Sequence, residues 1–217
     1  MSFAEYFSYN YLTLMTLSGL VLLMIVNKNA KIPASKLFAA GVLVLLSLTV
    51  TDYFGHYYQY ITAADPNAAA AIEKRYICNT VSYMIRPFII LIEVLVILPE
   101  KRYNYLCVIP AAASGIVYST RFFGSDLTYS PGDNNIFVGG PLHYTVFVVQ
   151  VIYILLLLTF SLVSFERNKR QSIMILGILA QAVVAALGEY VFKYNYDQVN
   201  HVTALCMLEY YMYPNIF

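Results

Sequence analysis

Seven segments of the sequence are apolar over about 20 positions each. A transmembrane helix needs about that length, because the hydrocarbon core of a bilayer is about 30 Å thick and a helix rises about 1.5 Å per residue. The fourth segment is the weakest, since it is short and contains Pro110. We predict an all-α, polytopic membrane protein, a bundle of seven transmembrane helices forming one domain over 1–217. The predicted spans are 6–26, 37–60, 76–98, 103–120, 143–165, 172–192 and 201–217.

The composition excludes an ordinary water-soluble domain. Hydrophobic residues make up 60% of the chain and charged residues only 12%, whereas a soluble domain has about a quarter charged residues. The net charge is +1 and no block of like charges occurs, so no nucleic-acid partner is expected. The first span lacks a basic flank before it and covers the full bilayer thickness, so we do not interpret it as a cleavable signal peptide.

Basic residues predict the orientation, because cytoplasmic loops retain Lys and Arg during insertion. The loops after the first, third and fifth spans hold eight basic residues, whereas the opposite loops hold four. The amino terminus is therefore predicted outside and the seventh helix leads into the cytoplasm. The eight are Lys28, Lys31, Lys36, Lys101, Arg102, Arg167, Lys169 and Arg170, and the four are Lys74, Arg75, Arg121 and Lys193.

The segment Ser119–Leu142 is the longest outer connection, and it is rich in Gly, Pro, Asp and Asn. A turn at Pro131–Asn134 flanked by Asp126–Ser130 and Ile136–Val138 predicts a short extracellular β-hairpin. We interpret it as a lid between the fourth and fifth helices. The alternative is a flexible connector.

Charged side chains within the spans are the candidates for function. Such a group costs about 2.5–3.5 kcal/mol near the bilayer centre, so it faces the bundle interior and finds a partner. Asn79, Ser82, Arg86 and Glu93 share one face of the third span. Pro87 follows Arg86 and can bend that helix. The other candidates are Asp52 with His56 one turn on, Glu189 with Gln181 two turns before it, and Glu209.

Four of these charged groups fall in the outer half of the membrane when positions are counted inward from the span ends, whereas Glu93 lies nearer the cytoplasm. This placement predicts an outward-facing polar cavity below the lid, with Arg86 as its fixed cation and Asp52 as its ion-pair partner. The alternative is a closed polar network that fixes helix register and binds nothing. The candidate ligand-binding residues are Arg86, Asp52, His56, Asn79, Ser82, Glu189, Glu209 and Tyr83.

Common catalytic and cofactor motifs are missing from the sequence. GxSxG, HExxH, P-loop and GxGxxG patterns do not occur in the required context, and the three histidines lack metal-ligand spacing. No span has an interior Lys that would hold a retinal Schiff base. We therefore expect no cofactor, no metal and no catalytic residue in these 217 residues.

The chain resembles the amino-terminal multi-span sensor region of bacterial receptors whose cytoplasmic outputs are GGDEF diguanylate cyclases or histidine kinases. The residues that carry the likeness are Asn79–Tyr83 with Arg86-Pro87, Asp126–Gly132 with Gly139–Leu142, and Leu208–Tyr211. The resemblance implies a multi-pass protein of the bacterial inner membrane that detects an extracellular or membrane-soluble ligand. It also implies cyclic di-GMP or kinase signalling through the seventh helix, with a homodimer possible.

A ligand-sensing module is the leading functional hypothesis. Ligand contact with the outer cavity would shift the balance between two helix packings, which requires a differential affinity of a few kcal/mol. Leu208–Phe217 ends within the predicted membrane with no basic flank, so we expect a longer parent with a cytoplasmic output domain. The alternatives are a short natural terminus for the chain end and, for function, a small secondary transporter or a purely structural membrane subunit.

Overall fold

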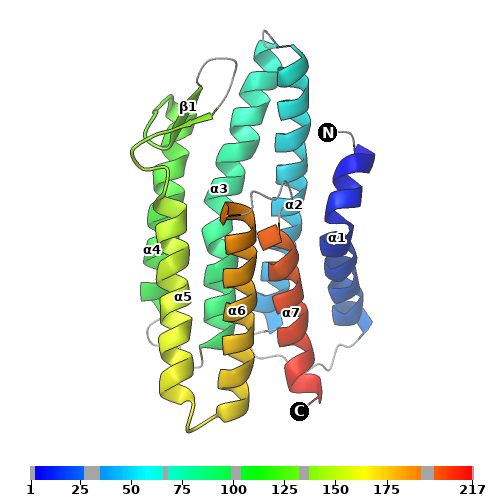
Figure 1. Cartoon of the computed structure of the whole chain (residues 1–217), viewed down its shortest axis with the longest axis vertical. Coiled ribbons are helices and arrows are strands. Elements are labelled where there is room, and N and C mark those ends of the chain that lie inside the picture. Colours follow the sequence, from blue (N-terminus) through cyan, green and yellow to red (C-terminus); the bar gives the residue numbers. More distant parts are fainter. Residues whose placement is uncertain are drawn as a thin grey trace. The chain divides into compact units, whose positions relative to one another are not determined.

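The computed structural model describes residues 3–26, 35–65, 68–98, 104–131, 137–191 and 198–216. Within these ranges the chain forms seven α-helices, one short 3-10 helix and two short strands (Figure 1). The all-α prediction is therefore confirmed at the level of helix content. The helices are α1 (Phe3–Val26), α2 (Ser35–Ala64), α3 (Ala69–Ile97), α4 (Asn104–Ser119), α5 (Thr145–Ser164), α6 (Lys169–Val191) and α7 (Gln198–Ile216), with η2 (Thr120–Phe123) after α4.

Five helical segments are long and apolar enough to cross a membrane, counted over the described residues. They correspond to α1, α2, α3, α4 extended through η2, and α5. Many large apolar side chains on these helices are exposed, such as Val163 at 79% and Ile116 at 67%. A water-soluble monomer rarely exposes so much apolar surface, whereas lipid covers it at no cost. The helices thus have the dimensions and surface of a membrane-embedded protein, and the count of seven spans stays a prediction.

The helix ends between α2 and α3 differ from the prediction. The third span was predicted to begin at Tyr76, whereas α3 begins at Ala69, and α2 continues four residues beyond its predicted end at Tyr60. Alanine is the best helix former, and the start of α3 is alanine-rich. The helix therefore begins before the apolar segment that predicted it. Pro87 lies inside α3 and Pro110 inside α4, and neither ends its helix.

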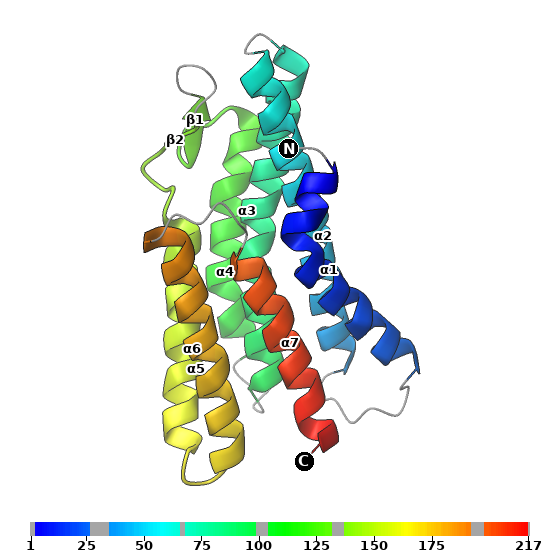
Figure 2. The same cartoon turned by 45° about the vertical axis from the view of Figure 1, so that its right-hand side comes forward.

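The predicted hairpin strands pair in the structure. Strand β1 (Tyr129–Pro131) and strand β2 (Phe137–Gly139) are antiparallel, with Tyr129 opposite Gly139 and Pro131 opposite Phe137 (Figure 2). Most of the predicted turn lies outside the described residues. Past β2, the Gly140 amide donates to the carbonyl oxygen of Thr128 at 2.9 Å, and a Cβ on Gly140 would collide with the backbone carbonyl of Leu127.

The chain divides into two compact units, described separately below. Unit 1 comprises 1–6, 47–91 and 100–151, and unit 2 comprises 7–46, 92–99 and 152–217. In unit 1, the close approach of α2 and α3 occurs at Gly55, where an added Cβ would lie 2.8 Å from the Asn79 side-chain oxygen. Small residues allow such close helix packing in membranes.

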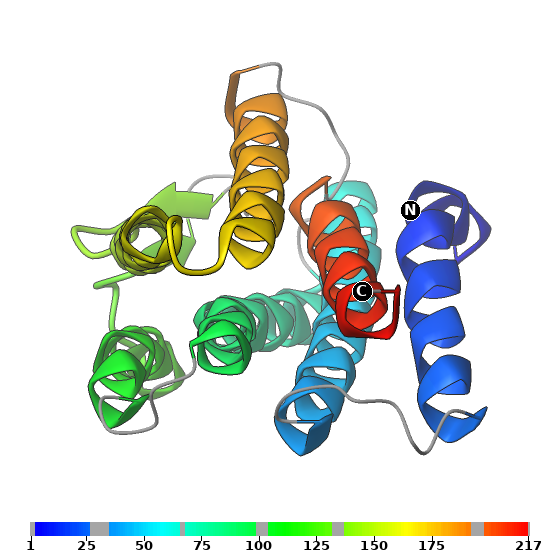
Figure 3. The ribbon, with the colours of Figure 1, turned by 90° about the horizontal axis from the view of Figure 1, so that it is seen from below.

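In unit 2, helices α5 and α6 are joined by a short turn, and α7 lies between α6 and α1 (Figures 1 and 3). The Ser161 hydroxyl donates to the carbonyl oxygen of Ser172 at 2.9 Å, which connects α5 to α6. The Tyr211 hydroxyl donates to the carbonyl oxygen of Leu23 at 3.2 Å, and Thr13 bonds the His201 ring, so two contacts connect α7 to α1. Buried polar groups on helix surfaces therefore hold these helices in register.

Candidate functional site

The predicted ion pair between Asp52 and Arg86 is present in unit 1. An Arg86 guanidinium nitrogen donates to the Asp52 carboxylate at 3.4 Å and connects α2 to α3. The carboxylate side chain is 8% exposed and the guanidinium side chain 27% exposed. Charge-assisted hydrogen bonds of this kind are usually 2.7–2.9 Å long and often bidentate. The 3.4 Å contact between Asp52 and Arg86 is therefore long for an ion pair, and the cation is the more accessible partner.

Three further predicted residues lie on the same part of α3. The Arg86 guanidinium carbon is 5.7 Å from the centre of the Tyr83 ring, within the range of a cation–π contact. The Ser82 side chain is 4% exposed, and its hydroxyl has no hydrogen-bond partner among the described residues. Asn79 lies at the close approach to Gly55 described above. Asn79, Ser82 and Arg86 are three of the four residues of the predicted polar face of α3.

His56 lies on α2, one turn beyond Asp52, and is half-buried. Its ring centre is 6.1 Å from the ring of Tyr6, and the Tyr6 hydroxyl donates to the carbonyl oxygen of Thr49 at 2.6 Å. The histidine therefore packs in an aromatic contact that connects the start of α1 to α2.

Tyr129 anchors the hairpin to the outer part of α3. Its side chain is 2% exposed, its hydroxyl donates to the carbonyl oxygen of Tyr76 at 3.1 Å, and it also bonds the Thr80 hydroxyl. Burial raises the pKa of Tyr129 to about 12, although hydrogen bonding to Thr80 and the nearby Arg121 oppose the shift. The phenol stays neutral at physiological pH and acts as a hydrogen-bond donor.

An aromatic cluster surrounds this anchor. Tyr118, Tyr129 and Val146 form its buried centre, and the Tyr83 ring stacks on Tyr118 with centres 5.0 Å apart. Tyr83 therefore contacts both Arg86 and the cluster that holds the hairpin. The partly buried members are Tyr76, Tyr83, Met84, Phe137 and Phe147.

Two arginines at the edge of this cluster lie over aromatic rings. The Arg75 guanidinium is 4.4 Å from the Phe137 ring centre, and the Arg121 guanidinium is 5.0 Å from the Tyr76 ring centre. Arg121 also pairs with Asp126 at 2.7 Å. The two strands are thus packed against α3 and η2 by aromatic and cationic side chains.

Glu209, another predicted ligand contact, lies on α7 in unit 2 and is exposed. Both of its carboxylate oxygens accept from the Gln181 side-chain amide, at 2.9 and 3.1 Å. Gln181 on α6 faces α7, so an amide on the neighbouring helix satisfies this acid. The side chain of Glu189, the other predicted acid on α6, lies outside the described residues.

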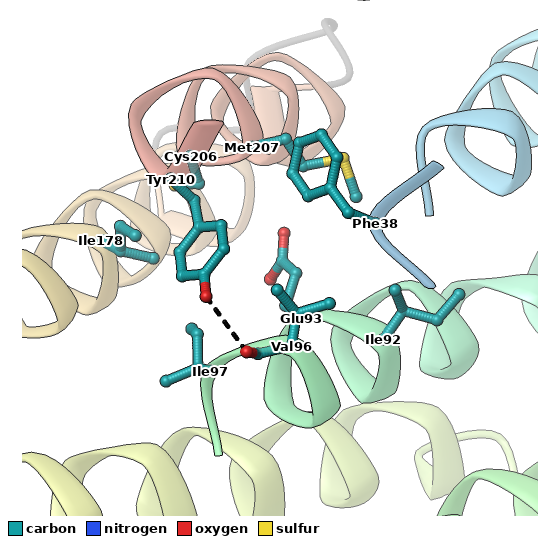
Figure 4. Close-up of a pocket in the computed structure, with 9 residues that line it drawn as sticks. All are labelled: Phe38, Ile92, Glu93, Val96, Ile97, Ile178, Cys206, Met207 and Tyr210. Atoms are coloured by element: carbon teal, nitrogen blue, oxygen red, sulfur yellow. Dashed lines mark hydrogen bonds between the residues drawn. The ribbon is translucent and has the colours of Figure 1, made fainter. Parts of the chain in front are cut away.

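The structure also places a pocket around Glu93, which the sequence had not put among the candidate ligand contacts. The pocket belongs to unit 2 and has a cavity volume of about 20 Å³. One Glu93 carboxylate oxygen is buried and has no hydrogen-bond partner among the described residues. Figure 4 shows this carboxyl pointing from α3 towards α7. The lining residues are Phe38, Ile92, Glu93, Val96, Ile97, Ile178, Cys206, Met207 and Tyr210.

The Glu93 pocket is closed on one side by Tyr210, whose hydroxyl donates to the carbonyl oxygen of Val96 at 3.1 Å (Figure 4). The Phe38 ring stacks beside it, with ring centres 6.3 Å apart. The position of Glu93 on the polar face of α3 is the one sequence signal for this pocket. The other lining residues are mostly apolar, so the sequence does not distinguish them from other apolar positions in the helices.

The described residues contain no group of three or more His, Cys, Asp or Glu side chains placed to hold a metal ion. No protein-family model matches the sequence, and neither a curated protein nor a solved structure shows a significant similarity to it. The function is therefore argued from the Asp52–Arg86 pair and its surroundings.

Proposed function

We propose that the chain is the membrane-embedded ligand-sensing module of a bacterial signalling receptor. The observation that carries the proposal is the long ion pair between Asp52 and Arg86, which joins α2 to α3. Arg86 also contacts Tyr83, which packs against the cluster that anchors the hairpin. A small extracellular or membrane-soluble ligand with an anionic group would bind Arg86 and replace Asp52.

The exchange combines a gain at Arg86 with a cost at Asp52. The Asp52–Arg86 contact is long, so it holds the guanidinium less firmly than a short charge-assisted hydrogen bond would. A ligand carboxylate that binds the guanidinium through two shorter bonds would be held more strongly. Because Asp52 is 8% exposed, displacing the Arg86 guanidinium would take a charge-compensating contact away from a buried carboxylate and disfavour the packing of α2 on α3.

The remaining parts of the proposal follow the resemblance to bacterial sensor regions. In that arrangement the protein lies in the bacterial inner membrane with its amino terminus outside and seven spans. The hairpin acts as a lid over the ligand, and α7 carries the signal to a cytoplasmic diguanylate cyclase or histidine kinase domain, with a homodimer as the expected assembly. The ligand would shift the balance between two packings of the helices. This shift requires that its binding free energy differ by a few kcal/mol between the two packings.

The proposal is tested by breaking the ion pair between α2 and α3 with Asp52→Asn, which removes the carboxylate charge beside Arg86. Spin labels on introduced cysteines at Tyr60 and Ile77, both exposed in unit 1, report the distance between α2 and α3 in nanodiscs after the three native cysteines are replaced. We expect Asp52→Asn to add a second distance population. Glu73→Gln, which removes an exposed acid on α3, should leave one population. An unchanged distribution in Asp52→Asn would contradict a two-state role for the ion pair.

Transport is the competing function. Pro87 lies between Arg86 and Glu93 in α3, and transporters often place substrate sites at interrupted helices. Proteoliposomes containing the chain and radiolabelled benzoate, an aromatic carboxylate, distinguish the two. Benzoate accumulation that is lost in Arg86→Ala would favour transport, whereas benzoate binding without accumulation would favour sensing.

A further inference from the structure

The connection between α5 and α6 carries a compact group of exposed charges (Figure 1). Residues 165–170, which we call the basic turn, contain Arg167, Lys169 and Arg170 against one acid, Glu166, so three positive charges and one negative charge give +2. All four of these charged residues are exposed. The turn follows α5, a helix long and apolar enough to cross a membrane, so its charges fall at the level of lipid headgroups. Such a patch attracts an anionic partner.

Hydrogen bonds order the backbone of the basic turn. The amides of Arg167 and Asn168 both donate to the carbonyl oxygen of Ser164, at 3.1 and 2.8 Å. The Asn168 side-chain amide donates to the side-chain oxygen of Gln171 at 2.8 Å. The cations therefore project from a tight turn between two helices, and less backbone entropy is lost when an anion binds among them.

Apolar residues lie directly beside these charges on both helices. Val163 is exposed at the end of α5. On α6, Ile173, Gly177 and Ala180 follow Lys169 at intervals of four, four and three, so they share its face of the helix. We call these three residues the apolar row, and all three are exposed. A cation at the head of an exposed apolar row matches an amphiphilic molecule, which has an anionic head and a hydrocarbon chain.

The apolar row has the length of one lipid leaflet. Gly177 and Ala180 lie about 12 and 16 Å from Lys169 along the helix axis, and half of a hydrocarbon core is about 15 Å thick. A Cβ on Gly177 would meet no atom within 4 Å, so the helix surface has room there for a chain. A soluble anion or an acidic protein segment would use the charges and leave the apolar row without a role, whereas a phospholipid uses both.

We propose that the basic turn and the apolar row bind an anionic phospholipid, with phosphatidylglycerol as the representative headgroup. The lipid phosphate lies among the three cations, and one acyl chain lies along the apolar row. The Lys169 ammonium nitrogen is 6.0 Å from the centre of the Phe165 ring, and aromatic rings of this kind favour the headgroup level. The surface shares no residue with the Arg86 site, so the inference does not rest on the proposed receptor function.

The chain contains no tryptophan, so a single introduced tryptophan reports which lipid touches it. Ile173→Trp places the reporter in the apolar row, and Val148→Trp places it at an exposed position near the other end of α5. In proteoliposomes, quenching by brominated phosphatidylglycerol and by brominated phosphatidylcholine gives the ratio of their binding constants at each reporter. One basic residue near a membrane surface strengthens anionic lipid binding about fivefold. We therefore expect a ratio of about five or more at Ile173→Trp and about one at Val148→Trp.

Removing the cations tests their role. Arg167→Gln, Lys169→Gln and Arg170→Gln, combined in the Ile173→Trp chain, should bring the ratio close to one, whereas Lys74→Gln, at an exposed lysine of α3, should leave it unchanged. Salt at about 1 M should lower the ratio without any substitution in the turn, because it screens exposed charges. Soluble glycerol phosphate should not relieve the quenching. Equal binding of the two lipids at Ile173→Trp, an equal preference at Val148→Trp, a ratio that survives loss of the three cations, or displacement by glycerol phosphate would each overturn the proposal.

Discussion

The anchoring of the hairpin by Tyr129 leads to a quantitative prediction. Tyr129→Phe keeps the ring and its packing but removes a hydroxyl that bonds the Tyr76 carbonyl and the Thr80 hydroxyl. Tyr76 lies within helix α3, so its carbonyl keeps the helical hydrogen bond, and Thr80 can turn its hydroxyl back to that same carbonyl. The net cost should therefore be about 1–2 kcal/mol, near the typical value for one buried hydrogen bond.

This cost corresponds to a 5- to 30-fold increase in the fraction of molecules with the hairpin undocked. Hydrogen–deuterium exchange of the chain in nanodiscs, read by mass spectrometry over 126–142, measures that fraction directly. Exchange in α6 should stay unchanged, because α6 belongs to unit 2. Tyr144→Phe, on a tyrosine that is 62% exposed, is the matched control. Equal exchange in Tyr129→Phe and the unaltered chain would refute the anchoring role.

Three further predictions concern the ionisation of Tyr129, the backbone at Gly140, and the acids Glu93 and Asp52. Because the pKa of Tyr129 is about 12 when the hairpin is docked and about 10 when it is exposed, docking is fully favoured below pH 10 and loses about 1.4 kcal/mol per pH unit up to pH 12. The stability advantage of the unaltered chain over Tyr129→Phe, measured as a Tm difference, should therefore shrink across that interval. Gly140→Ala should speed exchange in the hairpin, because its Cβ would collide with the Leu127 carbonyl, whereas Gly177→Ala has open space and should not. Glu93→Leu should raise the Tm because it removes an unpaired buried carboxylate oxygen, and a lower Tm would show that the carboxyl is satisfied. Asp52→Leu should lower the Tm because it removes the ion pair between α2 and α3.

The helices were predictable from the sequence because each coincides with an apolar segment of about 20 positions. Each predicted span matches a helix, and the largest difference in a boundary is at the start of α3, where the alanine-rich segment before Tyr76 is helical by intrinsic preference. The hairpin strands were predictable because turn residues interrupt the apolar pattern at Pro131–Asn134. Local chemistry determines these features, so no knowledge of the tertiary packing was required.

Side-chain partners were predictable only in part. Asp52 and Arg86 lie on consecutive helices at matched depth, and this was sufficient to pair them. The bond from Gln181 to Glu209 depends on how α6 is rotated against α7, and the sequence periodicity of these two helices does not determine that rotation. The pocket at Glu93 depends on four helices whose lining residues are far apart in the sequence.

Asp52 and Glu93 are both acids within predicted spans, yet the structure gives them opposite environments. Asp52 has an arginine at 3.4 Å, so its charge is compensated within the protein and its removal costs stability. Glu93 has an unpaired oxygen beside a cavity, so an apolar residue of similar size would pack there at lower cost. We therefore expect opposite responses to leucine at the two positions: replacing Asp52 should lower the stability of the chain, and replacing Glu93 should raise it.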